Sequence, residues 1–236
     1  MLPRILIFGT SISTYWLMFF IGLVGMAVIC WKRTKFYRFS GSGATAVVKG
    51  KSVIFTLLLA MFGLLGTKLL YIIENLQETL ENGITLGGQS FFGALFLVPI
   101  AVSLYGRVLG LKPLEATDYC APPVIFILMC MRLGCFMNGC CGGIMIGTFQ
   151  VPVQLIEAIG DACIFSFLLY YEDVKKRKGI LYPFLMGTYG ILRFFLEFLR
   201  DTPKDLLFIS RGQLFSILAL LIAVIWIVRV NHEKNM

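Results

Sequence analysis

Apolar residues fill most of this chain in long runs, and polar or charged residues separate one run from the next. Seven runs approach the roughly 20 residues with which a helix crosses about 30 Å of hydrocarbon. They lie at residues 12–31, 52–74, 87–106, 120–140, 152–171, 180–200 and 211–229. The segments between them are too short for a soluble domain. The pattern predicts an all-α polytopic membrane protein with about seven transmembrane helices, a single membrane domain over residues 1–236.

Composition agrees with this prediction. The mean hydropathy is +0.85 and only 14% of the residues are charged, values outside the usual range of soluble domains. The first run has the position of a signal peptide, but no small-residue cleavage site follows it and Lys32-Arg33 ends it. We therefore expect this run to be a retained helix.

The charges between the runs favour one orientation. A net charge of +8 would suggest nucleic acid as a partner of a soluble protein. With seven spans and an outside N-terminus, however, nearly all loop Lys and Arg residues fall on the inner face, as the positive-inside rule requires. The outer face carries only Arg4, Arg200, Lys204 and Arg211. We expect an inside C-terminus and no binding of nucleic acid.

Six ionisable residues fall inside the apolar runs, where each is costly without a partner or water. They are Lys68, Arg132, Arg193, Glu157, Asp161 and Glu197. Structural ion pairs between helices are one interpretation. Depth favours a functional site, because Arg132, Arg193, Glu157 and Lys68 each lie about 8–12 Å inside the outer end of their own helix. Independent structural pairs have no reason to share a depth, so we expect a site in the outer half of the bilayer.

One helical face carries a row of polar residues in the sixth run. Tyr189, Arg193, Glu197 and Arg200 follow the spacing i, i+4, i+8 and i+11. We expect Glu197 to neutralise Arg193. With Arg132 at the same depth, two guanidinium groups then face one cavity and favour a phosphate. A phosphate in a cavity that opens sideways into the bilayer indicates a phospholipid headgroup.

Glycines gather at the expected outer ends of two helices. They are Gly87, Gly88, Gly134, Gly139, Gly142 and Gly143. Glycine frees backbone N–H groups for an anion, but small residues also serve close helix packing in membranes. The pattern does not choose between these interpretations.

Three of the seven cysteines flank the same glycine-rich helix end, namely Cys135, Cys140 and Cys141. Three interpretations stay open. They are tolerated small residues, they form a disulfide at an oxidising outer surface, or one is a nucleophile that carries a lipid or acyl adduct. No second pair and no histidine stands at zinc-ligand spacing. We expect neither a metal nor a cofactor.

Six segments, in this order, resemble the signature segments of the prolipoprotein diacylglyceryl transferase family. They are TKLLYII (67–73), GGQSFFGAL (87–95), MRLGCFMNGCCGG (131–143), VPVQLIEA (151–158), GTYGILRFFLEFLRD (187–201) and RGQLFSI (211–217). The resemblance covers nearly the whole chain, and the YGxxRFxxExxR pattern is its most specific part. The family transfers a diacylglyceryl group from phosphatidylglycerol to the lipobox cysteine thiol of a secreted precursor and releases glycerol phosphate.

The resemblance implies roles for residues at matching positions. The expected catalytic residues are Arg132, Arg193, Glu157 and Glu197, with the arginines on the phosphate. Apart from the resemblance, Glu157, Asp161 or Glu197 could act as a base if burial raises its pKa, and Glu157 is the better candidate because Glu197 neutralises Arg193. The expected substrate-binding residues are Lys68, Asn138, Gly143, Gln154, Tyr189, Arg200 and Gln213. Further candidates are Tyr15, Cys135 and Cys140.

The chain also departs from the family pattern. Phe92 stands where the family has histidine, and His232, the only histidine, lies in the expected inner tail. A histidine base for the acceptor thiol is therefore absent. Cys135 replaces an asparagine and Cys140 an acidic residue. A positive field lowers the pKa of a thiol on its own, so the loss of histidine weakens the family mechanism without excluding it.

The sequence thus predicts a phospholipid-dependent transferase of a bacterial cytoplasmic membrane, with its active site open to the outer leaflet. The expected partners are phosphatidylglycerol or another glycerophospholipid, and a secreted precursor protein. One alternative is a related transferase that moves a diacylglyceryl or phosphoglycerol group to a different acceptor. The other is a noncatalytic lipid-binding or transport protein, although the two halves of the chain show no symmetry.

Overall fold

The computed structural model describes residues 4–7, 10–34, 45–83, 90–108, 111–175, 178–201 and 209–235. The chain divides into two units, one of residues 1–29 and 121–236 and one of residues 30–120. Among the residues singled out above, Gly87, Gly88 and Lys204 lie outside the described ranges.

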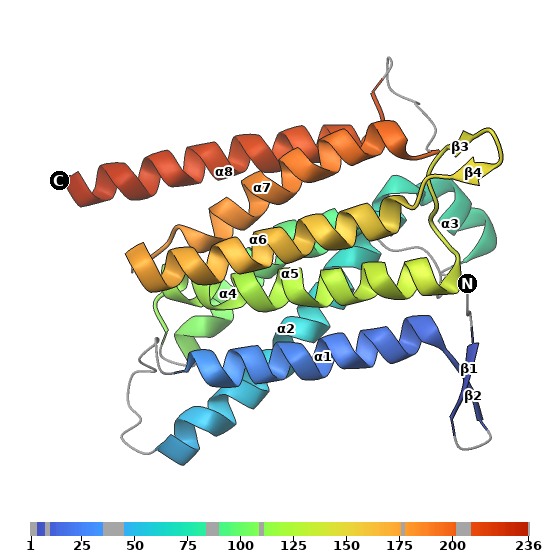
Figure 1. The fold of residues 1–236 in the computed structure, drawn as a ribbon. Coiled ribbons are helices and arrows are strands. Elements are labelled where there is room, and N and C mark those ends of the chain that lie inside the picture. The colour runs from blue at the N-terminus through green and yellow to red at the C-terminus, as the bar shows by residue number, and fades with distance from the viewer. Residues whose placement is uncertain are drawn as a thin grey trace. The chain divides into compact units, whose positions relative to one another are not determined.

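Helices dominate the described residues, and the hydrophobic runs predicted them well (Figure 1). They are α1 (Thr14–Arg33), α2 (Thr45–Glu74), α3 (Leu76–Asn82), α4 (Phe91–Val108), α5 (Pro113–Asn138), α6 (Val153–Lys175), α7 (Leu181–Leu196) and α8 (Arg211–Asn235). Every expected span has its helix, and α3 is an additional short one.

Five helices, α1, α2, α5, α6 and α8, are long and apolar enough to cross a bilayer, and Phe91–Arg107 is a shorter apolar helix. The chain is therefore a polytopic membrane protein. The expected span at 180–200 corresponds to α7, which has only 16 residues. The count of seven spans and the orientation stay predictions.

Two short antiparallel hairpins depart from the purely helical expectation. β1 (Arg4–Ile7) pairs with β2 (Thr10–Ser13), and β3 (Met145–Ile146) pairs with β4 (Phe149–Gln150). Strands of two to four residues are too short to leave a periodic hydrophobic signal.

In the unit of residues 30–120, the Arg33 side chain hydrogen-bonds to two backbone carbonyls of α5. Pro122 and Pro123 lie inside α5 and lack the N–H groups that would bond the carbonyls of Asp118 and Tyr119, four residues earlier. The guanidinium of Arg33 donates to both carbonyls, at 2.6 Å to Tyr119 and 3.2 Å to Asp118. The Arg33 side chain is buried, 3% exposed, and its position at the membrane interface stays a prediction.

Packing in each unit follows the apolar helix faces. In the larger unit, α7 packs against α6 and α8 (Figure 1). A small core of Val151, Val153 and Leu196 joins the start of α6 to the end of α7. In the other unit, α2 packs against α4. The α6–α7 junction holds the polar residues described next.

Candidate active site

The carboxylate of Glu157, in α6, gathers three arginines. Oε1 lies 3.0 Å from Arg132 Nε, while Oε2 lies 3.3 Å from Arg193 Nη1 and 3.5 Å from Arg200 Nη1. The phenol of Tyr189 donates to Oε1 at 3.1 Å. These contacts confirm the predicted meeting of α5, α6 and α7 at one level. Because both oxygens of Glu157 are engaged, the geometry favours holding the arginines over acting as a base.

A second carboxylate, that of Glu197, completes the ion cluster. Its Oε2 lies 3.2 Å from Arg193 Nη2, which confirms the expected neutralisation of Arg193. Glu197 is nearly buried, and Gly212 of α8 makes room for it. A Cβ on Gly212 would lie 2.7 Å from the Glu197 carboxyl carbon. The sequence interpretation missed Gly212, although it stands within the RGQLFSI segment.

Positive charge exceeds negative charge among the paired groups, since three guanidinium groups face the carboxylates of Glu157 and Glu197. Burial, together with the charges of Arg193 and Arg132, lowers the pKa of Arg200. Arg200 Nη1 and Arg132 Nε are buried and make no hydrogen bond within the described residues. The three side chains still keep 11–15% of their surface exposed. The cluster thus offers a net positive charge to an anion.

Arg200 reaches the cluster from outside the helix. α7 ends at Leu196, a single 3-10 turn (Glu197–Leu199) follows, and Arg200 is extended, with φ −96° and ψ 145°. The expected helical face of i+11 spacing is therefore wrong at its last position. Arg200 instead forms a β-bridge with Gly143, and Ile144 N–H donates to the Leu199 carbonyl at 2.9 Å.

Gly143 permits this close approach. A Cβ at this position would lie 2.9 Å from the Val151 carbonyl oxygen and would also collide with the Leu199 carbonyl. The N–H of Gly143 donates to the Val151 carbonyl at 2.9 Å. Of the two interpretations, close packing is confirmed for Gly143, and a free N–H for an anion is wrong.

Two glutamines expected to bind substrate hold backbone instead. Gln154, at the start of α6, donates from Nε2 to the Cys140 carbonyl at 2.5 Å. Gln213 accepts from the Ser210 N–H at 3.0 Å, while the Ser210 hydroxyl accepts from the Gln213 N–H at 3.1 Å. This reciprocal pair is a capping box at the start of α8. Direct contact of either glutamine with substrate stays a prediction.

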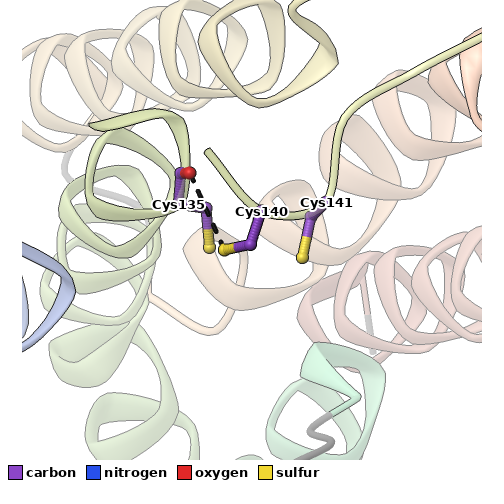
Figure 2. A group of neighbouring side chains, drawn as sticks. All are labelled: Cys135, Cys140 and Cys141. Atoms are coloured by element: carbon purple, nitrogen blue, oxygen red, sulfur yellow. Dashed lines mark hydrogen bonds between the residues drawn. The ribbon is translucent and has the colours of Figure 1, made fainter. Parts of the chain in front are cut away.

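The end of α5 brings three thiols together (Figure 2). Gly139 has φ 76°, its N–H donates to the Phe136 carbonyl, and the Cys140 N–H donates to the Cys135 carbonyl. These two bonds form a Schellman motif, which places the side chain two residues after the helix beside one in its last turn. Both are cysteines here, and the sulfurs of Cys135, Cys140 and Cys141 lie within 4.8 Å of one another.

Cys141 is the exposed member of this three-thiol cluster. Its φ is 60°, a left-handed conformation that costs a residue with a β-carbon about 1–2 kcal/mol. Hydrogen bonding with Cys135, and then the charges of Arg132 and Arg200, overcome the effect of burial and lower the pKa of its thiol to about 5. All three cysteines are free thiols in the structure. The sequence placed these three cysteines at one helix end but predicted no metal there, because the known zinc spacings have two separated pairs of ligands.

The other predicted residues lie around or apart from this site. Tyr15 is the second residue of α1 and lies near Gly134 and within electrostatic reach of Arg132. Asn138 is the half-buried last residue of α5. Lys68 and Phe92 belong to the unit of residues 30–120, where the ammonium of Lys68 lies 5.0 Å from the Tyr71 ring centre. The predicted shared depth of Lys68 therefore stays a prediction.

Asp161 lies one turn beyond Glu157 in α6 and is fully buried. Neither of its carboxyl oxygens has a hydrogen-bond partner among the described residues. It was recognised from the sequence as an intramembrane acid, and it lies within electrostatic range of Arg132 and Arg193.

Comparison with known proteins agrees with this arrangement. The family model for prolipoprotein diacylglyceryl transferase matches residues 3–229. Phosphatidylglycerol–prolipoprotein diacylglyceryl transferase of Clostridium tetani is 27% identical over 92% of this chain and 93% of its own length. Phosphatidylglycerol–prolipoprotein diacylglyceryl transferase 2 of Clostridium perfringens is 28% identical over 97% of this chain and 94% of its own length. The residues matched by the family model include Arg132, Glu157, Arg193 and Arg200. The chain therefore belongs to the prolipoprotein diacylglyceryl transferase family of membrane transferases.

Proposed function

We propose that this transferase moves a diacylglyceryl group from phosphatidylglycerol to the cysteine thiol of a secreted lipoprotein precursor. The main support is that three guanidinium groups meet at the carboxylate of Glu157. They come from α5, from α7 and from the segment after α7. The names of the relatives supply the donor and the acceptor class.

The ion cluster suits the bond that must break. Attack of a thiolate on the terminal glyceryl carbon breaks a C–O bond, and the bonding pair stays with the departing phosphate oxygen. The net positive charge of Arg132, Arg193 and Arg200 against two carboxylates suits the binding of the phosphate. Glu157 and Glu197 fix the guanidinium groups before the substrate arrives. Such preorganised donors stabilise developing charge in a site of low dielectric constant.

The location follows from the acceptor. A secreted precursor arrives on the outer side of a bacterial cytoplasmic membrane, so we place the arginine cluster in the outer leaflet. The β3–β4 hairpin next to the cluster supports an interfacial position. Its Met145, Ile146 and Phe149 side chains are 61–62% exposed, and apolar side chains of this size favour the membrane boundary over water.

The test uses the full chain in nanodiscs that contain labelled phosphatidylglycerol, with a lipobox peptide as acceptor. The peptide should gain one diacylglyceryl group while glycerol phosphate is released. Arg132→Lys and Arg193→Lys should each reduce turnover about a hundredfold, because Lys cannot hold a phosphate through two donors. Arg107→Lys, at the end of α4, is the control. Full turnover in both site variants would refute the phosphate role.

A different acceptor is the second candidate, and Phe92 favours it. This position is a buried phenylalanine that stacks on Phe96, with ring centres 6.1 Å apart, where the family resemblance leads one to expect histidine. Release of glycerol phosphate without modification of the peptide would support this candidate. Tight lipid binding without any turnover would support a noncatalytic role.

A further inference from the structure

The three-thiol cluster has the dimensions of a metal site. Zinc–sulfur bonds of about 2.3 Å in a tetrahedral site place sulfurs about 3.8 Å apart. The sulfurs of Cys135, Cys140 and Cys141 already lie within 4.8 Å of one another. The sulfur separations are therefore within about 1 Å of those in a tetrahedral zinc site.

The backbone of the cluster is organised in advance. The Schellman motif holds Cys140 beside Cys135, and Gln154 holds the Cys140 carbonyl from α6. Cys141 keeps a left-handed conformation, although it is not glycine. Strain of this kind persists where the surrounding structure enforces it and often marks a functional site. Figure 2 shows the Cys140 sulfur directed toward Cys135, with the Cys141 side chain next to it.

We propose that Cys135, Cys140 and Cys141 bind one Zn²⁺ as thiolates and that its fourth position takes the acceptor thiol. This inference rests on the proposed function. Among the described residues the group contains three thiols and no fourth ligand. Catalytic zinc sites have this form, with three protein ligands and one open position for water or substrate. Zn²⁺ with three thiolates carries one net negative charge, and the guanidinium groups of Arg132 and Arg200 lie within electrostatic range of Cys141.

The ion would supply what the missing histidine does not. The acceptor thiol displaces the water on Zn²⁺ and gives its proton to solvent, because a coordinated thiol is deprotonated outright. The bound sulfur then forms a C–S bond to the terminal glyceryl carbon. The C–O bond to phosphate breaks, its electron pair leaves with glycerol phosphate, and the zinc keeps its charge of +2 throughout. No oxidant or reductant is needed.

The nucleophile interpretation fits this chemistry less well. A cysteine of the cluster that attacked the glyceryl carbon would become a thioether. A thiolate is a poor leaving group from a thioether, so the diacylglyceryl group could not pass on to an acceptor. A cysteine that activates the acceptor through a metal stays unchanged through the reaction.

Metal content tests the site without any activity measurement. The full chain is purified in detergent without chelator and analysed by mass spectrometry of metals and X-ray absorption. One zinc per chain is expected, with three sulfur neighbours at about 2.3 Å. Ser replacement of Cys135, Cys140 or Cys141 should each lower the zinc content at least fivefold. Cys163→Ser, an exposed cysteine of α6, is the matched control. Absence of zinc, copper in its place, or a disulfide within the cluster would each overturn the proposal.

Turnover separates this inference from the proposed function. Removing zinc with a chelator should lower peptide modification about a hundredfold, and adding Zn²⁺ should restore it without any change of the chain. Unchanged modification by zinc-free protein would overturn the role in thiol activation while the proposed function stands. One bound zinc with three sulfur neighbours, but no peptide modification under any condition, would leave the metal site standing and refute the proposed function.

Discussion

Replacement of Glu157 by Gln tests whether this carboxylate holds the arginines in place. The substitution keeps the size of the side chain and an oxygen that can accept from Tyr189. It removes the negative charge that faces Arg132, Arg193 and Arg200 at 3.0–3.5 Å. Three guanidinium groups then face one another, and Glu197 is the carboxylate that still pairs with one of them.

Removal of one partner from a buried ion pair costs about 3–5 kcal/mol. For a chain of this size that free energy corresponds to a melting temperature about 10 °C lower. The assay follows the fluorescence of the three tryptophans during heating in one detergent. Glu81→Gln, at an exposed residue of α3, is the control and should change the melting temperature by no more than about 2 °C.

A second substitution makes the test specific for charge. Arg200→Gln added to Glu157→Gln removes one of the repelling cations and should recover about 1–2 kcal/mol. The same Arg200→Gln change in the native background should not stabilise the protein. A Glu157→Gln variant that melts with the wild type, or a double variant whose losses simply add, would refute this account of the cluster.

Three further variants test the backbone around the site and in α5. Gly143→Ala should reduce turnover more than about tenfold, because the added Cβ would collide with the Val151 carbonyl. Gly63→Ala, at a position with open space, is the control and should keep its turnover. Equal turnover in both variants would contradict the role of the β-bridge between Gly143 and Arg200. Arg33→Leu should lower the free energy of unfolding by about 2–4 kcal/mol. Adding Pro123→Ala restores one N–H to α5 and should recover about 1 kcal/mol in the same melting assay. If nothing is recovered, the unpaired carbonyls of Asp118 and Tyr119 contribute little to the loss. Gln213→Ala should lose about 1 kcal/mol of stability with the capping box and keep its turnover per folded molecule, whereas lost turnover at unchanged stability would restore its expected role in substrate binding.

The helices were predictable because the thickness of hydrocarbon dictates the length of an apolar run. The runs cannot show which apolar residues pack inside the protein and which face lipid, because both kinds are equally hydrophobic. The β3–β4 hairpin was missed for another reason. Its strands have only two residues each, and the residue before β3, Ile144, bonds to Leu199 in the segment after α7. Contacts of this kind leave no local sequence pattern that predicts the strands.

The site was predictable where helix geometry alone decides it. Depth along independent helices was enough to bring Arg132, Glu157 and Arg193 together. Arg200 was placed correctly in the cluster for a wrong reason, because the helix ends before it and a β-bridge to Gly143 takes over. Non-local backbone pairing of this kind leaves no sequence period.

The thiol cluster left a readable signal that the zinc templates do not include. A cysteine in the last turn of α5 and another directly after Gly139 occupy the two positions that a Schellman motif brings into contact. The sequence placed these cysteines at one helix end, and the Schellman motif adds that the side chains of Cys135 and Cys140 lie side by side.

The arginine cluster also constrains how the protein enters the membrane. Arg132 and Glu157 belong to α5 and α6, so each of these two helices released alone into lipid would carry an uncompensated charge. α5 and α6 neutralise one another as soon as both have been made, and α7 arrives with Glu197 directly behind Arg193. We therefore expect the insertion machinery to release these helices as a group, in the order in which the ribosome delivers them.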